Sequence, residues 1–305
     1  MTPLALSVVM AASSPTRPAA LAEAVQALEA GCRGVDAELL VVGDGLGAIT
    51  APSFGRVRAI ECAPDRLSPE RWGDGARVAD GRVIAFTTDQ MRVGAGWGRA
   101  LVASIDAGAT GVGGTITLDA RADADTAAAH LIRFSAFLPG AHRERHAVTD
   151  VAGDNAAYSR AAIWTHTDLL GEGFWEVEFH HRFVREGLRL EMTPDAPAQL
   201  VGPIAIGALA RQRFAHARVF GSTRVRQHGA SRWRIVLAAP LVPWVLLARM
   251  RRRAQADAAS AGRFRGLLPR LACLACAWAA GEAVGALLGR SGEVVTSGAA
   301  TTAGP

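Results

Sequence analysis

The chain has 305 residues, half of them hydrophobic, and carries a formal net charge of +5. This length suits one large α/β domain with an appendage, or two ordinary domains. All 33 basic residues are arginines, which excludes Schiff-base chemistry on a lysine and phosphate binding by a P-loop lysine. Many arginines lie beside apolar stretches near the C-terminus, which favours a membrane surface over nucleic acid as the anionic partner.

The first part of the chain alternates strand and helix patterns. Residues 4–10 form a continuous apolar run, and Leu21, Val25 and Leu28 then recur at helical spacing up to Gly31. Further strand patterns occupy residues 38–42, 56–61, 82–87 and 110–118, and helical patterns occupy 97–107 and 127–138. This alternation predicts an α/β fold with a mostly parallel, Rossmann-like sheet flanked by helices.

A loop, a helix and a short strand complete this domain, which we place at residues 1–210. Residues 148–158 have the composition of an irregular loop. Residues 176–186 have a helical pattern that ends at Gly187, and residues 189–192 are a strand pattern stopped by Pro194.

The cysteines and the N-terminus indicate a cytoplasmic domain. The four cysteines are Cys32, Cys62, Cys273 and Cys276, and the apolar run around the last two offers no histidine or further cysteine at metal-ligand spacing, so we expect reduced, structural thiols. The apolar run of residues 4–10 is too short for a signal-peptide core and lacks a preceding basic region.

The C-terminal third divides into three predicted segments. Residues 211–232 form a basic amphipathic connector, residues 233–290 a membrane-associated helical segment, and residues 291–305 a disordered tail. The apolar run 235–250 is about 24 Å long as a helix, shorter than the roughly 30 Å hydrocarbon core. The second run, 271–289, is long enough to cross, but Glu282 then requires a partner, either Arg270 or an arginine of the linker 251–265.

Two crossings would place the arginine-rich linker on the outer side, against the positive-inside rule. We therefore expect an apolar helical hairpin that re-enters or lies in the interface at the cytoplasmic face of the cell membrane. A soluble helical domain is the alternative.

The loops after three predicted strands should form a ligand site. In open α/β sheets ligands bind beyond the carboxyl ends of the strands, so the loops that start at Ala11, Gly43 and Thr87 should converge. Asp44 and Asp89 should then face one crevice, although a turn role for Asp44 and a helix-capping role for Asp89 stay open.

Several segments, in order along the chain, resemble family 2 glycosyltransferases, which have the GT-A fold. They are LALSVVMAASSPTRPAALAEAVQAL with VDAELLVVGDG, RVIAFTTDQMRVGAGW, GVGGTI, GDNAAYSRAAI and GFWEVEFHHRFVREGLRLEMTPDA. The resemblance implies an inverting enzyme that moves a sugar from a nucleotide-sugar donor to a hydroxyl group of an acceptor. The arginine-led apolar tail is similar to that of family members that act at the membrane on lipid-linked or polysaccharide acceptors, such as cell-envelope polysaccharide.

The same resemblance assigns roles to single residues. The general base is Glu176, with Glu178 as the alternative, and the acceptor is bound by Asp154, Asn155 and Trp175. The donor is contacted by residues of the strand ends and their loops: Ala11, Ser13, Asp44, Thr88, Asp89 and Gln90.

The chemistry requires these residue types. A carboxylate deprotonates the acceptor hydroxyl during its attack on the anomeric carbon, and a divalent cation such as Mg²⁺ or Mn²⁺ neutralises the departing diphosphate. In the DxD motif position, Thr88-Asp89-Gln90 offers Asp89 as the one carboxylate, so metal dependence is open. For His180 and His181 we expect solvated or capping roles, and we predict no zinc site.

Two other functions fit parts of the pattern. A catalytically degenerate GT-A-like binding or scaffold protein would explain the incomplete DxD motif. An NAD(P)-dependent Rossmann oxidoreductase would use Gly43-Asp44-Gly45-Leu46-Gly47 for phosphate binding and Glu61 for the ribose.

Overall fold

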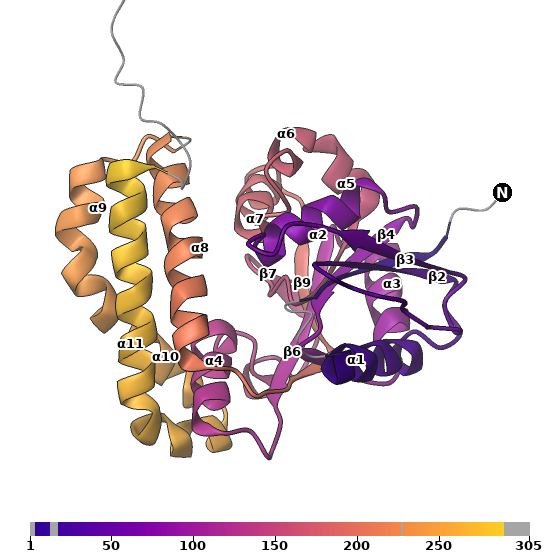
Figure 1. The fold of residues 1–305 in the computed structure, drawn as a ribbon, viewed down its shortest axis with the longest axis horizontal. Helices are drawn as coiled ribbons and strands as arrows, with labels where there is room; N and C mark the ends of the chain where they lie inside the picture. Colours follow the sequence, from indigo (N-terminus) through magenta and orange to yellow (C-terminus); the bar gives the residue numbers. More distant parts are fainter. Residues whose placement is uncertain (1–3, 13–17, 227, 290–305) are drawn as a thin grey trace, which may run out of the picture. The chain divides into compact units, whose positions relative to one another are not determined.

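The computed structural model describes residues 4–12, 18–226 and 228–289 (Figure 1). The chain divides into two compact units, and their positions relative to one another are not determined. The first unit comprises Met1–Pro203 with Arg253–Gly262, and the second comprises Ile204–Arg252 with Arg263–Pro305. Ser13 and the predicted disordered tail, residues 291–305, lie outside the described residues.

The first unit is built on a nine-stranded sheet. Four strands run parallel in the order β3-β2-β1-β4: β1 (Leu6–Ala11), β2 (Ala37–Gly43), β3 (Arg56–Glu61) and β4 (Val83–Thr88). Next comes β8 (Asn155–Ser159), antiparallel to both β4 and β6 (Gly111–Leu118). The strand β9 (Leu190–Leu200) is parallel to β6, while β5 (Met91–Val93) and β7 (His146–Val148) pair with β9 in antiparallel fashion.

The α/β class is therefore confirmed, but the sheet is mixed rather than mostly parallel. Half of the strand pairings are antiparallel, and all of these involve β8 or the short strands β5 and β7. The sequence patterns did not predict these three strands. The predicted loop 148–158 contains most of β8, whose residues are mainly small and lack the β-branched side chains that mark strands.

The predicted end of β9 is also wrong, because the strand continues past Pro194 to Leu200. Its pairing with β6 covers residues 190–193 and 198–200, with a register shift between Gly114 and Ile116. Pro194 and Pro197 therefore lie in the part of β9 that is not paired with β6, where no N–H group is needed for that pairing.

Helices flank the sheet. They are α1 (Pro18–Gly31), α2 (Ser68–Arg77), α3 (Trp97–Asp106), α4 (Ala124–Phe134), α5 (Arg160–Thr165), α6 (Thr167–Leu170) and α7 (Glu176–Arg185), with a 3₁₀ turn η1 (Pro139–Ala141). The helix α2 packs on β1 and β2, where a Cβ atom on Gly75 would lie 2.3 Å from the Val9 side chain. Only glycine permits this close approach, which brings α2 and its side chains to the carboxyl ends of the parallel strands.

The second unit is helical. Its elements are α8 (Ile206–Arg226), α9 (Arg232–Ala238), η2 (Ala239–Leu241), α10 (Val242–Ala254) and α11 (Ala258–Leu288), although residues 253–262 belong to the first unit. Most of the predicted connector, residues 211–232, is therefore part of α8. By length and composition, Arg232–Ala254 and Ala258–Leu288 are each long and apolar enough to cross a membrane.

Small residues allow α8 and α11 to pack closely. A Cβ atom on Gly281 would lie 2.2 Å from the carbonyl oxygen of Phe214, and one on Gly285 would lie 1.9 Å from that of Arg218. Glycines four residues apart on one helix face give this backbone-to-backbone contact. The buried Glu282 lies between them in sequence.

Glu282 forms an ion pair with Arg224 of α8. A partner for this carboxylate was expected, but the arginine comes from α8 rather than from Arg270 or the linker 251–265. Both members of this ion pair belong to the second unit, so the charge of Glu282 is compensated within that unit.

Candidate active site

The predicted donor residues gather at one end of the sheet. Ala11 pairs with Val42 of β2 and with Thr88 of β4, so β1, β2 and β4 end at the same level. Asp44 and Asp89 therefore lie at the same carboxyl edge, as expected, but they follow β2 and β4, which are separated by β1 and are not the neighbouring strands that we predicted. The side chain of Ala11 is buried, and its carbonyl oxygen accepts a hydrogen bond from the Asp89 amide at 3.2 Å.

The end of β4 is a buried polar segment. Thr88 and Asp89 are each only 4 % exposed, and no hydrogen-bond partner for the Thr88 hydroxyl is found among the described residues. The guanidinium of Arg92 donates to the Asp89 carbonyl oxygen at 2.9 Å. Because β5 begins at Met91, Asp89 does not cap a helix.

Arg133 of α4 joins the end of β4 to the loop before β8. Its guanidinium donates to the Gln90 side-chain oxygen at 3.1 Å and forms an ion pair with Asp154. Asp154 is buried, so this pairing supplies the positive charge that a buried carboxylate needs. The predicted donor residue Gln90 and the predicted acceptor residue Asp154 are thus held by one side chain.

Glu176 is the first residue of α7 and is half-buried. Burial raises the pKa of its carboxyl group from 4.5 to about 8, and the negative charges of Asp154 and Asp150 add to this effect. The positive charge of Arg133 opposes it. Such a carboxyl group can exchange a proton near neutral pH, which is what a general base requires.

The backbone of the loop before β8 lies close to the carboxyl group of Glu176. A Cβ atom on Gly153 would lie 2.8 Å from the Trp72 ring and 3.3 Å from the Glu176 carboxyl carbon. The indole nitrogen of Trp72 donates to the carbonyl oxygen of Thr87 at 2.8 Å. These contacts place Glu176 beside the end of β4 and leave no room for a side chain at position 153.

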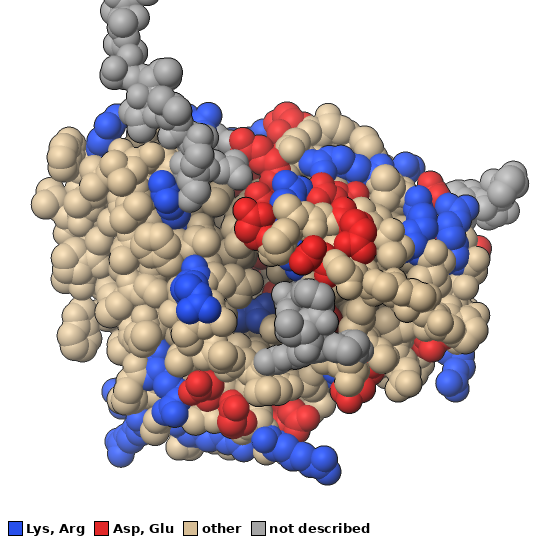
Figure 2. All heavy atoms as spheres, viewed as in Figure 1, with Lys and Arg blue, Asp and Glu red and all other residues tan. Residues whose placement is uncertain are grey.

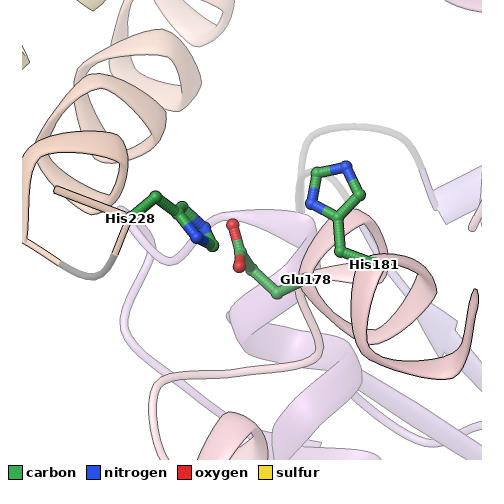
Figure 3. A group of neighbouring side chains, drawn as sticks. All are labelled: Glu178, His181 and His228. Carbon is green, nitrogen blue, oxygen red and sulfur yellow. The ribbon is translucent and has the colours of Figure 1, made fainter. Parts of the chain in front are cut away.

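The two candidate bases point in different directions, as their spacing predicted. Glu176 shares a helix face with His180 and Phe183, which are both buried. Glu178 and His181 extend from a different face of α7 (Figure 3). Figure 3 also labels His228, but this residue belongs to the second unit, so no metal site is assigned to the three side chains.

His180 is not the solvated or capping residue that we expected. It is 1 % exposed, its Nε2 atom lies 2.7 Å from the Tyr158 hydroxyl, and its Nδ1 atom lies 2.6 Å from Asp150. Burial holds the pKa of Tyr158 well above its usual value. His180 therefore ties α7 to β8 and to the loop that carries Asp150, whereas His181 is exposed as expected.

Two predicted acceptor residues are occupied by protein contacts. Asn155 is fully buried, donates to backbone carbonyl groups of β6 and β9 at 3.1 and 3.0 Å, and accepts from the Trp97 indole at 2.7 Å. It holds three strands and α3 together. Trp175 is half-buried and donates its indole N–H to the Glu172 carbonyl oxygen at 3.1 Å. Of the three predicted acceptor residues, Asp154 is the one whose charge acts on Glu176.

Sequence reasoning did not identify Arg71, a buried arginine of α2. Its guanidinium is 5 % exposed and donates to the carbonyl oxygens of Ala12, directly after β1, and Pro64. Within the described part of the chain, no carboxylate lies within ion-pair distance of it and its Nε has no hydrogen-bond partner. A buried cation without a counter-charge is costly, so this edge of the sheet suits an anionic ligand.

A cavity of about 650 Å³ is lined by residues of α1, β5, the β6–α4 connection and the segment after β9. Arg92, which contacts the Asp89 backbone, lines it together with Glu23, Asp119 and Arg121. This volume lies in the range of small-molecule sites, and the lining offers both donors and acceptors of hydrogen bonds.

Asp89 is the carboxylate of the predicted metal-binding segment that is not paired with Arg133. Asp89 supplies the one carboxylate of the Thr88–Gln90 segment, the Gln90 oxygen accepts from Arg133, and Asp154 is already paired with Arg133. Mg²⁺ is usually held by one or two carboxylates together with substrate phosphates, so Asp89 would have to act together with the phosphates of a bound donor.

The geometry of a dinucleotide site is absent from residues 44–61. No helix follows the glycine-rich turn, and β3 begins directly at Arg56. The Glu61 carboxylate accepts from the backbone N–H groups of Gly45 and Leu46 at 2.9 and 3.0 Å. A Rossmann site needs a helix N-terminus at the turn and an acid available to the ribose.

No protein-family model matches this chain, and a search of the curated proteins finds no match. The geometry of the site is therefore what a functional assignment rests on.

Proposed function

We propose that this chain is an inverting glycosyltransferase of the GT-A type. It would transfer a sugar from a nucleotide-sugar donor to a hydroxyl group of a lipid-linked or polysaccharide acceptor at the cytoplasmic face of the membrane. The observation that carries the proposal is Glu176, a half-buried carboxyl group whose pKa is raised to about 8 beside the end of β4.

In the proposed reaction, Glu176 accepts the proton of the acceptor hydroxyl. The hydroxyl oxygen forms a bond to the anomeric carbon while the bond from that carbon to the diphosphate oxygen breaks. The nucleoside diphosphate leaves with the bonding electrons, and a single displacement inverts the anomeric configuration. A pKa near the working pH suits this proton transfer, and the Arg133–Asp154 pair fixes the charges around the base.

The donor side of the proposal is supported by the charges at the carboxyl edge of the sheet. A nucleoside diphosphate bound there would bring negative charge to the edge at which Arg71 is buried without a carboxylate partner among the described residues. Asp44 and the segment from Thr88 to Gln90 lie at the same edge, where polar groups can contact the base, ribose and sugar. No step of the mechanism is assigned to a metal ion.

The membrane part of the proposal is supported by the two apolar helices of the second unit. A lipid-linked or membrane-bound acceptor is the substrate class that benefits from such an attachment. The arginines around these helices favour the cytoplasmic face under the positive-inside rule.

The test has a binding stage and a turnover stage. In a thermal-shift screen of UDP-, GDP- and dTDP-sugars, with and without Mn²⁺, we expect stabilisation by one nucleotide class. A response only to NAD(P) would overturn the proposal. Stabilisation without turnover on any acceptor would favour the binding or scaffold protein.

The turnover stage compares Glu176→Gln with Glu178→Gln. Glutamine keeps the size of the side chain but cannot accept the proton, so Glu176→Gln should lower turnover about 10²–10⁴-fold with nearly unchanged donor binding. Glu178→Gln is the matched control and should be close to wild type. If only Glu178→Gln is inactive, the base is Glu178, and if both variants are active the mechanism is wrong.

A further inference from the structure

A stripe of large apolar side chains on α9, η2 and α10 faces outward. We call residues 232–252 the apolar arm. The outward side chains are Trp233, Leu237, Leu241, Trp244 and Val245, which are 63, 77, 64, 72 and 47 % exposed. Buried side chains, such as those of Ile235 and Met250, occupy other positions of the same helices.

The spacing of these residues is that of one continuous helix face. Successive exposed positions are three or four residues apart, with Val245 next to Trp244. A helix at a protein surface normally turns polar side chains to water and apolar ones to the core. The apolar arm reverses this pattern, and an exposed apolar stripe of this kind marks a binding surface.

The charge of the apolar arm indicates the partner. Residues 232–252 contain five arginines and neither aspartate nor glutamate. Arg232 and Arg234 lie at one end of the stripe, and Arg249, Arg251 and Arg252 lie at the other. Around α9, Figure 2 shows a mostly tan surface with isolated blue side chains. A second copy of the arm would bring arginines against arginines, whereas an anionic bilayer offers both an apolar interior and negative phosphates.

Arg232–Ala254 as a whole is long enough to cross a membrane, but the part of it that contains no arginine is too short. Residues 235–248, which lie between the arginines, span about 21 Å at 1.5 Å per residue, against a hydrocarbon core of roughly 30 Å. A crossing would also place arginines on both sides of the membrane. Trp233 and Trp244 lie near the two ends of the stripe, and indole rings prefer the interface between headgroups and acyl chains.

We propose that the apolar arm lies in the plane of an anionic bilayer surface. Its stripe contacts the acyl chains, and the arginines at both ends contact lipid phosphates. This inference specifies the membrane attachment of the proposed function but does not depend on the transfer chemistry.

The test uses the full-length protein with vesicles of phosphatidylcholine alone or mixed with phosphatidylglycerol. We expect binding to the anionic vesicles that weakens with salt, and about tenfold or greater loss of binding for the double variant Trp233→Ser with Trp244→Ser. The matched control is Val78→Ser with Trp164→Ser, which removes two exposed apolar side chains of the first unit, 41 and 39 % exposed, and should bind normally. The charge-reversal variant Arg232→Glu with Arg234→Glu should lose about fivefold or more per arginine on anionic vesicles.

Other outcomes overturn the inference. Binding by the tryptophan double variant that equals that of the control would show that the stripe does not contact lipid. Cysteines introduced near residues 235 and 248 can be labelled from either side of sealed membranes. Labelling of the two positions from opposite sides would show that the arm crosses. Self-association of the free protein that disappears in the double variant, without vesicle binding, would make a second copy the partner. The thermal-shift response to nucleotide-sugars is measured in parallel, since it should be unchanged in every variant and reports separately on the proposed function.

Discussion

Replacing Glu176 with glutamine should change the pH dependence of stability as well as activity. Below about pH 4.5, the carboxyl group is protonated in both the folded and the unfolded chain. Between about pH 4.5 and 8, the unfolded chain releases this proton while the folded protein retains it. Unfolding therefore becomes more favourable as the pH rises through this window, and the loss is complete above the folded pKa.

The size of the effect follows from the shift in pKa. From 4.5 to about 8 at roughly 1.36 kcal/mol per unit, the carboxyl group costs on the order of a few kcal/mol of folding free energy at high pH. Glutamine does not ionise in this range. The variant should therefore be close to wild type in stability at low pH and increasingly more stable than wild type as the pH rises.

Urea denaturation at a series of pH values measures this difference directly. The observable is the unfolding midpoint of Glu176→Gln minus that of wild type, and Glu178→Gln is measured in parallel as the same substitution on another face of α7. A difference that stays constant across the window would refute the raised pKa of the half-buried Glu176 carboxyl group, whatever reaction the protein catalyses.

Four further outcomes are expected. Turnover should rise with pH up to about 8 as the proposed base ionises, and a flat profile would contradict that role. Arg133→Met should leave Asp154 buried without its cation and lower the free energy of unfolding by about 3–5 kcal/mol, whereas unchanged stability would argue against the ion pair. Gly153→Ala should crowd the base and lower turnover more than donor binding, and normal turnover would show that the loop can yield. Gly285→Ala should lower the Tm because its Cβ atom would meet a backbone oxygen of α8. In the control Gly266→Ala the Cβ atom would meet nothing within 4 Å, so the higher helix propensity of alanine should raise the Tm. A rise in Tm for both variants would contradict the close packing of α8 and α11.

The part of the fold that the sequence predicts is the part with strong local patterns. The cores of β1, β2 and β4 are continuous apolar runs, and they lie where the pattern placed them. The strand β8 was missed because Asn155–Ser159 has no β-branched residue and is held by pairing with strands far away in the sequence. Pro194 would ordinarily end a strand, and only the register shift between β9 and β6 makes it harmless.

The candidate site divides in the same way. Helical spacing alone separated Glu176 from Glu178, because the two positions lie on different faces of one helix. The ion pair of Arg133 with Asp154 and the buried His180 were not visible, since each depends on partners brought together by the tertiary fold. Arg71 has a weak local signal, as an arginine next to Trp72 in a helix where both side chains are buried.

The division of the chain into units has a consequence for attempts to produce the first unit by itself. The chain passes between the two units three times, after Pro203, after Arg252 and after Gly262. The segment Arg253–Gly262 belongs to the first unit, where a Cβ atom on Gly140 would lie 1.9 Å from the Ala256 carbonyl oxygen. Truncation after Pro203 would therefore remove Arg253–Gly262, which is part of the first unit. Substitution of the exposed apolar residues of the apolar arm, without truncation of the chain, keeps the first unit complete.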